Sequence, residues 1–148
     1  MKNIIRNLKS QFLKYNIDGY IIPKNDEFFS EYSNKDRLKK ISNFTGSAGY
    51  AVILKNDNYL FVDSRYTIQA QIESGKKFKI LSYENIFNCK IFKKLTIGID
   101  PALFTSNQIK KIFSYNKIKL IKKNLIDNVI KLKNKKSKPF YSLKKKIV

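Results

Sequence analysis

Two short apolar runs around an Asn/Asp-rich loop constrain the fold of this chain more than any other feature. Residues 50–54 and 59–62 are apolar, and the four residues between them are Lys-Asn-Asp-Asn. Strand-like runs joined by a short loop of turn-forming residues predict a β-hairpin. The fold must therefore accommodate at least one antiparallel pair of strands.

Amphipathic helices alternate with further strand patterns around this hairpin. Ile5, Leu8, Phe12 and Tyr15 follow one another at steps of three and four residues, which predicts a helix with one apolar face. Asn16 stands where a left-handed C-terminal cap is expected. The other predicted strands are residues 19–22, 77–81, 95–99 and 117–120, and the other predicted helices are 67–74, 106–113 and 125–132.

This alternation predicts one α/β domain with a mixed β-sheet flanked by helices. With 148 residues the chain is long enough to bury a real core. The domain is expected to span residues 1–132, because the lysine-rich stretch with a proline at 133–148 has the composition of a linker. We expect that linker to lead toward a second domain that this chain lacks.

The chain contains no histidine. This excludes Ser-His-Asp and Cys-His triads and every zinc or iron site that needs imidazole. Cys89 is the single cysteine, so no intramolecular disulfide forms, and its apolar neighbours favour a buried thiol over a reactive one. Such cysteine usage fits a reducing compartment. Histidine- or metal-centred catalysis by this chain alone is not expected.

The net charge of +20 has two explanations. One is a nucleic-acid surface, and the other is codon bias in an AT-rich genome, which raises Lys, Asn and Ile together. Among the 31 basic residues the arginines are Arg6, Arg37 and Arg65, and the lysines are spread along the whole chain. Because arginine is preferred for phosphate and base recognition, this favours codon bias and argues against nucleic acid as a partner. A retained arginine is then expected to need its planar fork.

Membrane association is not expected either. No apolar run approaches the roughly 20 residues that cross a bilayer. The first residues lack the apolar segment and the cleavage site of a secretory signal. These observations predict a cytoplasmic protein.

Residues 46–49, Gly-Ser-Ala-Gly, are the first candidate site. A GxxG nucleic-acid clamp or a phosphate-binding turn needs a helix directly after it, whereas a strand pattern follows here. Ser47 has no histidine to act as its base, which argues against a nucleophile. The residues favour a tight turn that needs glycine for its backbone angles.

Residues 63–66, Asp-Ser-Arg-Tyr, are the second candidate site. They lie where a predicted strand passes into a helix, a usual place for ligand contacts in α/β sheets. Asp63 is placed to cap the helix, and Arg65 can then bind a carboxylate or a carbonyl. A local Asp–Arg surface pair explains the same residues equally well. Residue chemistry alone leaves both interpretations open.

Several strings together resemble one known family. They are residues 18–23, 30–32, 44–49 and 62–70, with 98–101 and 124–127 in matching order and spacing. The combination resembles the N-terminal domain of Xaa-Pro aminopeptidases, the creatinase N-terminal domain that precedes a pita-bread catalytic domain. The three-domain cytosolic form is the most similar. Ser64 stands where this family usually has Gly, and Asn43 where it often does.

The resemblance implies a parent hydrolase, a proline-specific metallo-aminopeptidase that removes the N-terminal residue before a proline. It implies two divalent metal ions, commonly manganese, held in a C-terminal catalytic domain, so no catalytic or metal-binding residue is assigned to this chain. Arg65 matches the family arginine that helps to hold the peptide, with Asp63 and Tyr66 supporting its position. The resemblance also implies a homodimer in which this domain shapes access for peptides with proline at the second position.

Other classes of function stay open at this point. A small basic nucleic-acid-binding protein would bind with a steep salt dependence and some sequence preference. A stand-alone remnant domain would fold without belonging to a peptidase. A creatinase-type hydrolase could share the same front domain.

Overall fold

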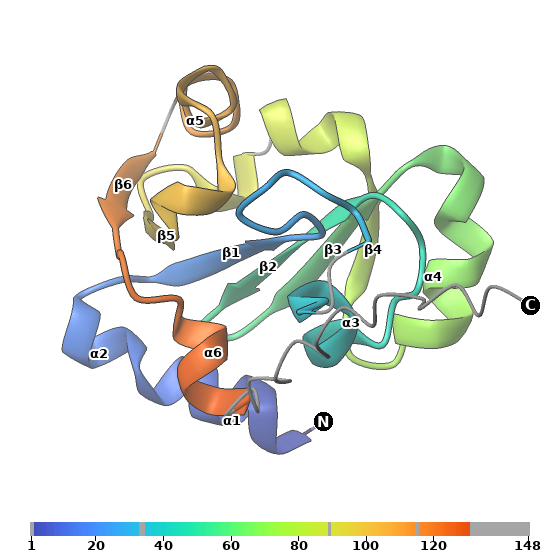
Figure 1. Ribbon diagram of the computed structural model, residues 1–148, viewed down its shortest axis with the longest axis horizontal. Coiled ribbons are helices and arrows are strands. Elements are labelled where there is room, and N and C mark those ends of the chain that lie inside the picture. Colours follow the sequence, from blue (N-terminus) through green and yellow to red (C-terminus); the bar gives the residue numbers. More distant parts are fainter. Residues whose placement is uncertain (1, 33–34, 89, 115, 131–148) are drawn as a thin grey trace, which may run out of the picture.

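The computed structural model describes residues 2–32, 35–88, 90–114 and 116–130 (Figure 1). Cys89 and the expected linker at 133–148 lie outside the described residues. A six-stranded sheet runs through the molecule in the order β4-β3-β2-β1-β5-β6, and helices cover both of its faces. The predicted α/β fold with a mixed, helix-flanked sheet is therefore confirmed.

The strand directions bring most carboxyl ends of the strands to one edge. β2 pairs antiparallel with both β1 and β3, while β3–β4, β1–β5 and β5–β6 are parallel pairs. Within the described residues, β2 thus runs against the other five strands. The strands are β1 (Gly19–Pro23), β2 (Gly49–Leu54), β3 (Asn58–Val62), β4 (Lys79–Ser82), β5 (Thr96–Ile99) and β6 (Lys117–Leu120).

Two helical layers bury the two faces of the sheet. Because side chains alternate along a strand, Tyr20 and Ile22 of β1 face one layer and Ile21 faces the other. The first layer comprises α1 (Lys2–Ser10), α2 (Phe12–Tyr15), α3 (Arg37–Ser42), α4 (Thr67–Ser74) and α6 (Leu125–Ile130). The second comprises α5 (Ser106–Ile112) and the 3₁₀ turns η2 (Tyr83–Asn88), η3 (Lys90–Phe92) and η4 (Pro101–Leu103).

Local sequence signals place several element boundaries as predicted. Asn16 caps α2 with φ 52° and ψ 52°, and the Ile17 amide donates back to the Phe12 carbonyl at 3.0 Å. Thr105 and Gln108 form the predicted capping box at the start of α5. The hairpin closes through the Leu54 amide and the Asp57 carbonyl at 2.8 Å. These short-range patterns therefore determine where α2 ends, where α5 begins and where the hairpin loop closes.

The first strand includes Pro23, whereas the sequence predicted a strand over residues 19–22. The following amide, on Lys24, donates to the Gly49 carbonyl of β2 at 3.1 Å, so the Pro23 nitrogen points away from β2. On that side the ladder with β5 covers Gly19 and Tyr20 alone. Proline is tolerated because no ladder donor is needed there.

The helix predicted over residues 67–74 forms as α4, but its largest apolar side chains face outward. Ile68 and Ile72 are 78% and 80% exposed, whereas Ala70 and Ser74 are buried. Small residues let α4 lie close against the sheet. Periodicity predicted this helix correctly, but the apolar pair is on its outer face.

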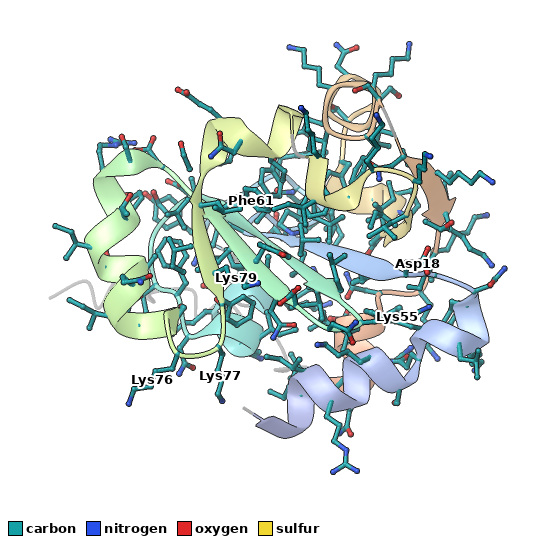
Figure 2. All side chains as sticks on the ribbon, turned by 180° about the vertical axis from the view of Figure 1, so that it is seen from behind. Asp18, Lys55, Phe61, Lys76, Lys77 and Lys79 are labelled. Carbon is teal, nitrogen blue, oxygen red and sulfur yellow. The ribbon has the colours of Figure 1, made fainter. Side chains whose placement is uncertain are left out.

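Lysines are distributed over the surface rather than gathered at one site. Lys76 and Lys77 project away from the fold at the turn between α4 and β4, and Lys55 lies beside Asp18 near the hairpin (Figure 2). The Lys55 ammonium and the Asp18 carboxylate are 3.1 Å apart. No helix among the described residues is long and apolar enough to cross a membrane.

Candidate functional site at the carboxyl edge of the sheet

The candidate residues lie where the parallel strands end. Lys24 and Asn25 follow β1, Asp63 and Arg65 follow β3, and Tyr83 follows β4. The start of β2 reaches the same edge, because this strand runs in the opposite direction. In open α/β sheets, ligands bind outside the carboxyl ends of the strands. We therefore expect a ligand-binding site at this edge of the sheet.

Asp63 holds Arg65 at this edge through two kinds of contact. Its carboxylate caps η1 (Ser64–Tyr66) by accepting from the Arg65 amide at 2.9 Å, as the sequence predicted. The same oxygen accepts from Nε of Arg65 at 3.0 Å. The Arg65 hydrogen bond holds the pKa of Asp63 below its ordinary value. The arginine side chain remains 76% exposed, so its guanidinium is presented to solvent.

Tyr66 connects this arginine to the turn at residues 46–49. The Arg65 guanidinium lies 5.8 Å from the centroid of the Tyr66 ring, and the Tyr66 hydroxyl is 2.8 Å from Oγ of Ser47. Phe44 packs edge-on against the same ring, with centroids 6.0 Å apart. The two candidate sites of the sequence are therefore one structure, in which Ser47 supports Tyr66.

Glu73 of α4 ties the Phe44–Ser47 segment to the helix that follows Arg65. Its carboxylate accepts from the Thr45 amide at 2.9 Å and from the Thr45 hydroxyl at 2.7 Å. Gln69 donates to the Thr45 hydroxyl at 2.7 Å and to Glu73 at 3.2 Å. Burial opposes ionisation of Glu73, but the hydrogen bonds from Thr45 and Gln69 and the charge of Lys39 together lower its pKa. Residues Thr45, Gln69 and Glu73 were not singled out individually from the sequence.

The predicted reason for the glycines at residues 46–49 is wrong. None of the glycines has a positive φ, so special backbone angles do not require them. Space does: a Cβ on Gly46 would lie 2.2 Å from the Phe44 ring, and one on Gly49 would lie 2.9 Å from the Phe61 carbonyl oxygen. Close packing against Phe44 and β3 is what demands glycine here.

A cleft of about 260 Å³ lies beside this arrangement at the same edge. Ser47 lines the cleft and also contacts the Tyr66 hydroxyl. The cleft is therefore connected to Arg65 through Ser47 and Tyr66. Tyr50 and Tyr83 form one side with stacked rings 5.3 Å apart. Burial raises the pKa of Tyr50, so its hydroxyl stays neutral. Phe29 and Glu31 lie at the cleft from the loop that follows β1.

The comparisons with known proteins agree with this fold. Residues 5–129 match the family described as the Creatinase/Prolidase N-terminal domain. This chain belongs to that family.

Relatives of the creatinase/prolidase N-terminal domain include both enzymes and isolated domains. A probable Xaa-Pro aminopeptidase P from Coprinopsis cinerea is 31% identical over 137 residues, covering 82% of this chain. An X-prolyl aminopeptidase from Caenorhabditis elegans, a cytosolic enzyme with a di-nuclear active site, superposes with a TM-score of 0.71 at 24% identity over 84% of this chain. The N-terminal domain of a cytoplasmic peptidase from Mycobacterium tuberculosis gives 0.66 at 15% over 85%. The two structures support the fold alone.

The share of each relative that is matched differs strongly. The chain spans 22% of the Coprinopsis relative and 24% of the Caenorhabditis chain, but 97% of the Mycobacterium domain. It thus corresponds to about one fifth of the length of the curated relatives that it matches.

This creatinase/prolidase N-terminal domain does not itself provide a metal centre among the residues described. They contain no group of three or more His, Cys, Asp or Glu side chains that could hold a metal ion. The chain has no histidine at all. The metal ions implied by the resemblance therefore do not fit the donor set of this domain.

Arg37 is a structural side chain whose partners sequence reasoning did not identify. It is 2% exposed and donates from Nε and Nη2 to the two carboxylate oxygens of Asp127 at 2.7 and 2.8 Å. Nη2 also donates to Glu27 at 2.7 Å. Burial disfavours the charged guanidinium, yet these carboxylates raise the pKa of Arg37. The expectation that a retained arginine needs its planar fork holds for Arg37.

The family strings at residues 98–101 and 124–127 serve the fold. Asp100 accepts from the side chain of Asn124 at 2.9 Å, and Asn124 in turn accepts from the Ile126 amide at 3.0 Å. Asp100 and Asn124 are both buried, and Asp127 of the same string is the partner of Arg37. These residues join β5 to α6 and do not line the cleft.

Proposed function

We propose that this domain is the non-catalytic N-terminal part of a proline-specific metallo-aminopeptidase. In this proposal it shapes the access of peptides with proline at the second position and contributes Arg65 to their binding. The chemistry then belongs to a C-terminal catalytic domain with divalent metal ions, commonly manganese. We expect the whole protein to be a cytoplasmic homodimer.

The geometry of Arg65 is the observation that carries this proposal. Its guanidinium is exposed at the carboxyl edge of the sheet, while Asp63 and the Tyr66 ring hold its stem in one direction. A planar, always charged fork that is presented in this way suits a carboxylate or a carbonyl of a peptide. The similarity to Xaa-Pro aminopeptidases supplies the substrate class.

The size of the native polypeptide is the first test. An immunoblot of the source cells with antibody against this domain should show a band several times longer than 148 residues. That result supports a parent enzyme, whose hydrolysis of Xaa-Pro peptides with manganese is assayed next. A band at the length of this chain would overturn the proposal in favour of a stand-alone domain.

Replacement of Arg65 tests the site in the polypeptide of native length. We expect Arg65→Ala to lower kcat/KM on Xaa-Pro peptides about 10- to 100-fold, the usual effect of losing a charge-assisted hydrogen bond. Arg6→Ala removes an exposed arginine that lies on α1 and is the matched control. This variant should leave kcat/KM unchanged. Equal values for the Arg65 variant and the control would remove Arg65 from the site.

A further inference from the structure

The cleft beside Arg65 has the dimensions of a site for one side chain. Its volume is about 260 Å³. Sites for whole small-molecule ligands usually measure roughly 300–1,000 Å³. A single long side chain of a bound peptide fits this smaller space better than a complete ligand does.

The wall of the cleft presents aromatic surface in a fixed arrangement. Tyr50 and Tyr83 stack against each other, and Tyr50 also stacks on Phe104 with ring centroids 6.2 Å apart. Phe29 adds a third aromatic lining residue from the opposite loop. Tyr50 is 5% exposed and stacked on two rings, so Phe29, which is 50% exposed, offers the accessible aromatic face. Aromatic side chains of this kind bind alkyl chains and attract cations.

Phe29 is held in a conformation that a bulky residue rarely adopts. Its φ is 59°, in the left-handed region that costs a residue with a Cβ about 1–2 kcal/mol. Asp26 maintains this loop: its carboxylate accepts from the amides of Phe28 and Ser30, both at 2.9 Å. Strain of this type concentrates at ligand clamps, where the surrounding structure maintains it. The loop thus holds Phe29 at the cleft at a conformational cost.

Glu31 and Asn25 provide hydrogen-bond acceptors at the cleft, whose lining also includes the hydroxyls of Ser47, Tyr50 and Tyr83 and the amide of Gln108. Glu31 takes part in none of the ion pairs between described residues, and its partner is the Tyr32 hydroxyl. The Asn25 amide donates to the carbonyls of Asp26 and Leu103 at 3.1 and 3.0 Å. Since carbonyls only accept, these contacts fix the orientation of the amide and leave its Oδ1 as an acceptor.

The single lysine of the cleft does not turn it into an anion site. Lys24 is 8% exposed, and its ammonium contacts the carboxylate of Asp36, which caps α3. The charge of Lys24 is therefore neutralised by Asp36. Glu31 is the other charged side chain of the cleft, and it forms no ion pair with a described residue.

We propose that this cleft binds the ammonium group of a lysine side chain in a peptide. The alkyl stem lies against Phe29 and the edge of the Tyr50–Tyr83 stack, and the ammonium donates to Glu31 and to Oδ1 of Asn25. The inference takes from the proposed function only that the ligand is a peptide. A peptide N-terminus carries the same ammonium chemistry but lacks the four-carbon stem that the aromatic wall accommodates.

Titration of this chain with small probes, followed by amide chemical shifts, tests the proposal without any peptidase activity. The probes are Nα-acetyl-lysine amide, Nα-acetyl-norleucine amide and norleucine amide with a free α-ammonium. We expect the lysine probe to bind about tenfold more tightly than the other two and to shift the amides of Glu31 and Tyr50. Equal affinity for acetyl-lysine and acetyl-norleucine amides overturns the proposal. A preference for the free α-ammonium assigns the cleft to an N-terminus and also overturns it.

Two variants and one control keep the outcome decisive. Glu31→Gln should abolish the tenfold preference, while Asp57→Asn, which removes one negative charge at the far end of the sheet, should keep it. Phe29→Gly should weaken lysine binding without lowering thermal stability, because glycine relieves the positive φ. If Glu31→Gln binds lysine as tightly as the parent chain, the cleft is not a cation site. Retained lysine binding in a protein without Xaa-Pro hydrolysis would leave this inference standing and remove the proposed function.

Discussion

Arg37 and Arg65 place the same side chain in opposite surroundings. Arg37 is 2% exposed and reaches carboxylates on two other segments, whereas Arg65 is 76% exposed and contacts the carboxylate two residues before it. The first pairing draws distant parts of the chain together, and the second only orients one residue. In a chain with three arginines, one therefore holds the fold and another is presented to solvent.

The largest expected effect comes from removing the buried arginine. Arg37→Met leaves Asp127 and Glu27 without their cation, and breaking a buried pair in this way costs about 3 kcal/mol. We expect the free energy of unfolding in urea to fall by that amount. Arg65→Met should leave it unchanged within the error of the measurement. Equal losses for both variants would contradict the distinction between the two arginines.

Replacement of Arg37 by lysine separates the effect of its charge from that of its planar shape. Arg37→Lys keeps the charge but cannot bond both oxygens of Asp127, so a loss of about 1–2 kcal/mol is expected. Asp127→Asn tests the same fork from the other side if Arg37 variants fold too poorly to measure. A lysine variant as stable as the parent chain would show that the planar fork is not required.

Acid should destabilise the Arg37 region before it alters Arg65. Burial opposes ionisation of Glu27, but the hydrogen bond and charge of Arg37, together with a backbone hydrogen bond and the charge of Lys35, lower its pKa below the ordinary value. A depressed pKa contributes stability that is complete above the unfolded value and is lost as the pH falls through the folded value. Unfolding midpoints between about pH 6 and pH 3 should therefore decline less steeply in Arg37→Met than in the parent chain. Parallel curves would exclude Glu27 from the acid response.

A smaller effect is expected where the support of Arg65 meets α4. Thr45→Val removes a hydroxyl that bonds Glu73 and Gln69, at a cost of about 1 kcal/mol in unfolding free energy. In the native-length polypeptide the variant should also lower kcat/KM a few-fold, because the Phe44–Ser47 segment supports Tyr66. Thr67→Val, which removes a hydroxyl that bonds the Ser64 carbonyl in the same region, provides a comparison.

The smallest effect concerns Asn43, which joins the two regions. It ends α3, the helix that begins at Arg37, and has φ 65° and ψ 1°. Glycine adopts this conformation without a Cβ penalty, so Asn43→Gly should stabilise the domain by a few tenths of a kcal/mol and Asn43→Ala should destabilise it. Calorimetric melting temperatures of the two variants provide the measurement. A lower melting temperature for glycine would contradict the assigned conformation.

Local chemistry was readable from the sequence, and long-range pairing was not. The caps at Asn16, Asp63 and Thr105 depend on neighbouring residues, so their patterns predicted them correctly. The partner of Arg37 lies 90 residues away, and no local pattern indicates it. The glycine requirement at Gly46 likewise arises from the Phe44 ring, which propensity does not describe. Resemblance pointed to Arg65, while the surroundings of the cleft needed coordinates.

The span between Arg37 and Asp127 also has a consequence for biosynthesis. Gln11 of the first helical segment donates to the Leu125 carbonyl at 3.2 Å, so both ends of the described chain meet in the same layer. A nascent chain cannot complete either contact until residue 127 has left the ribosome. Contacts this distant in sequence slow folding, because a large loop must close before they form. The guanidinium of Arg37 is therefore exposed to water and to chaperones until residue 127 has emerged, and its burial is a late step in the folding of this domain.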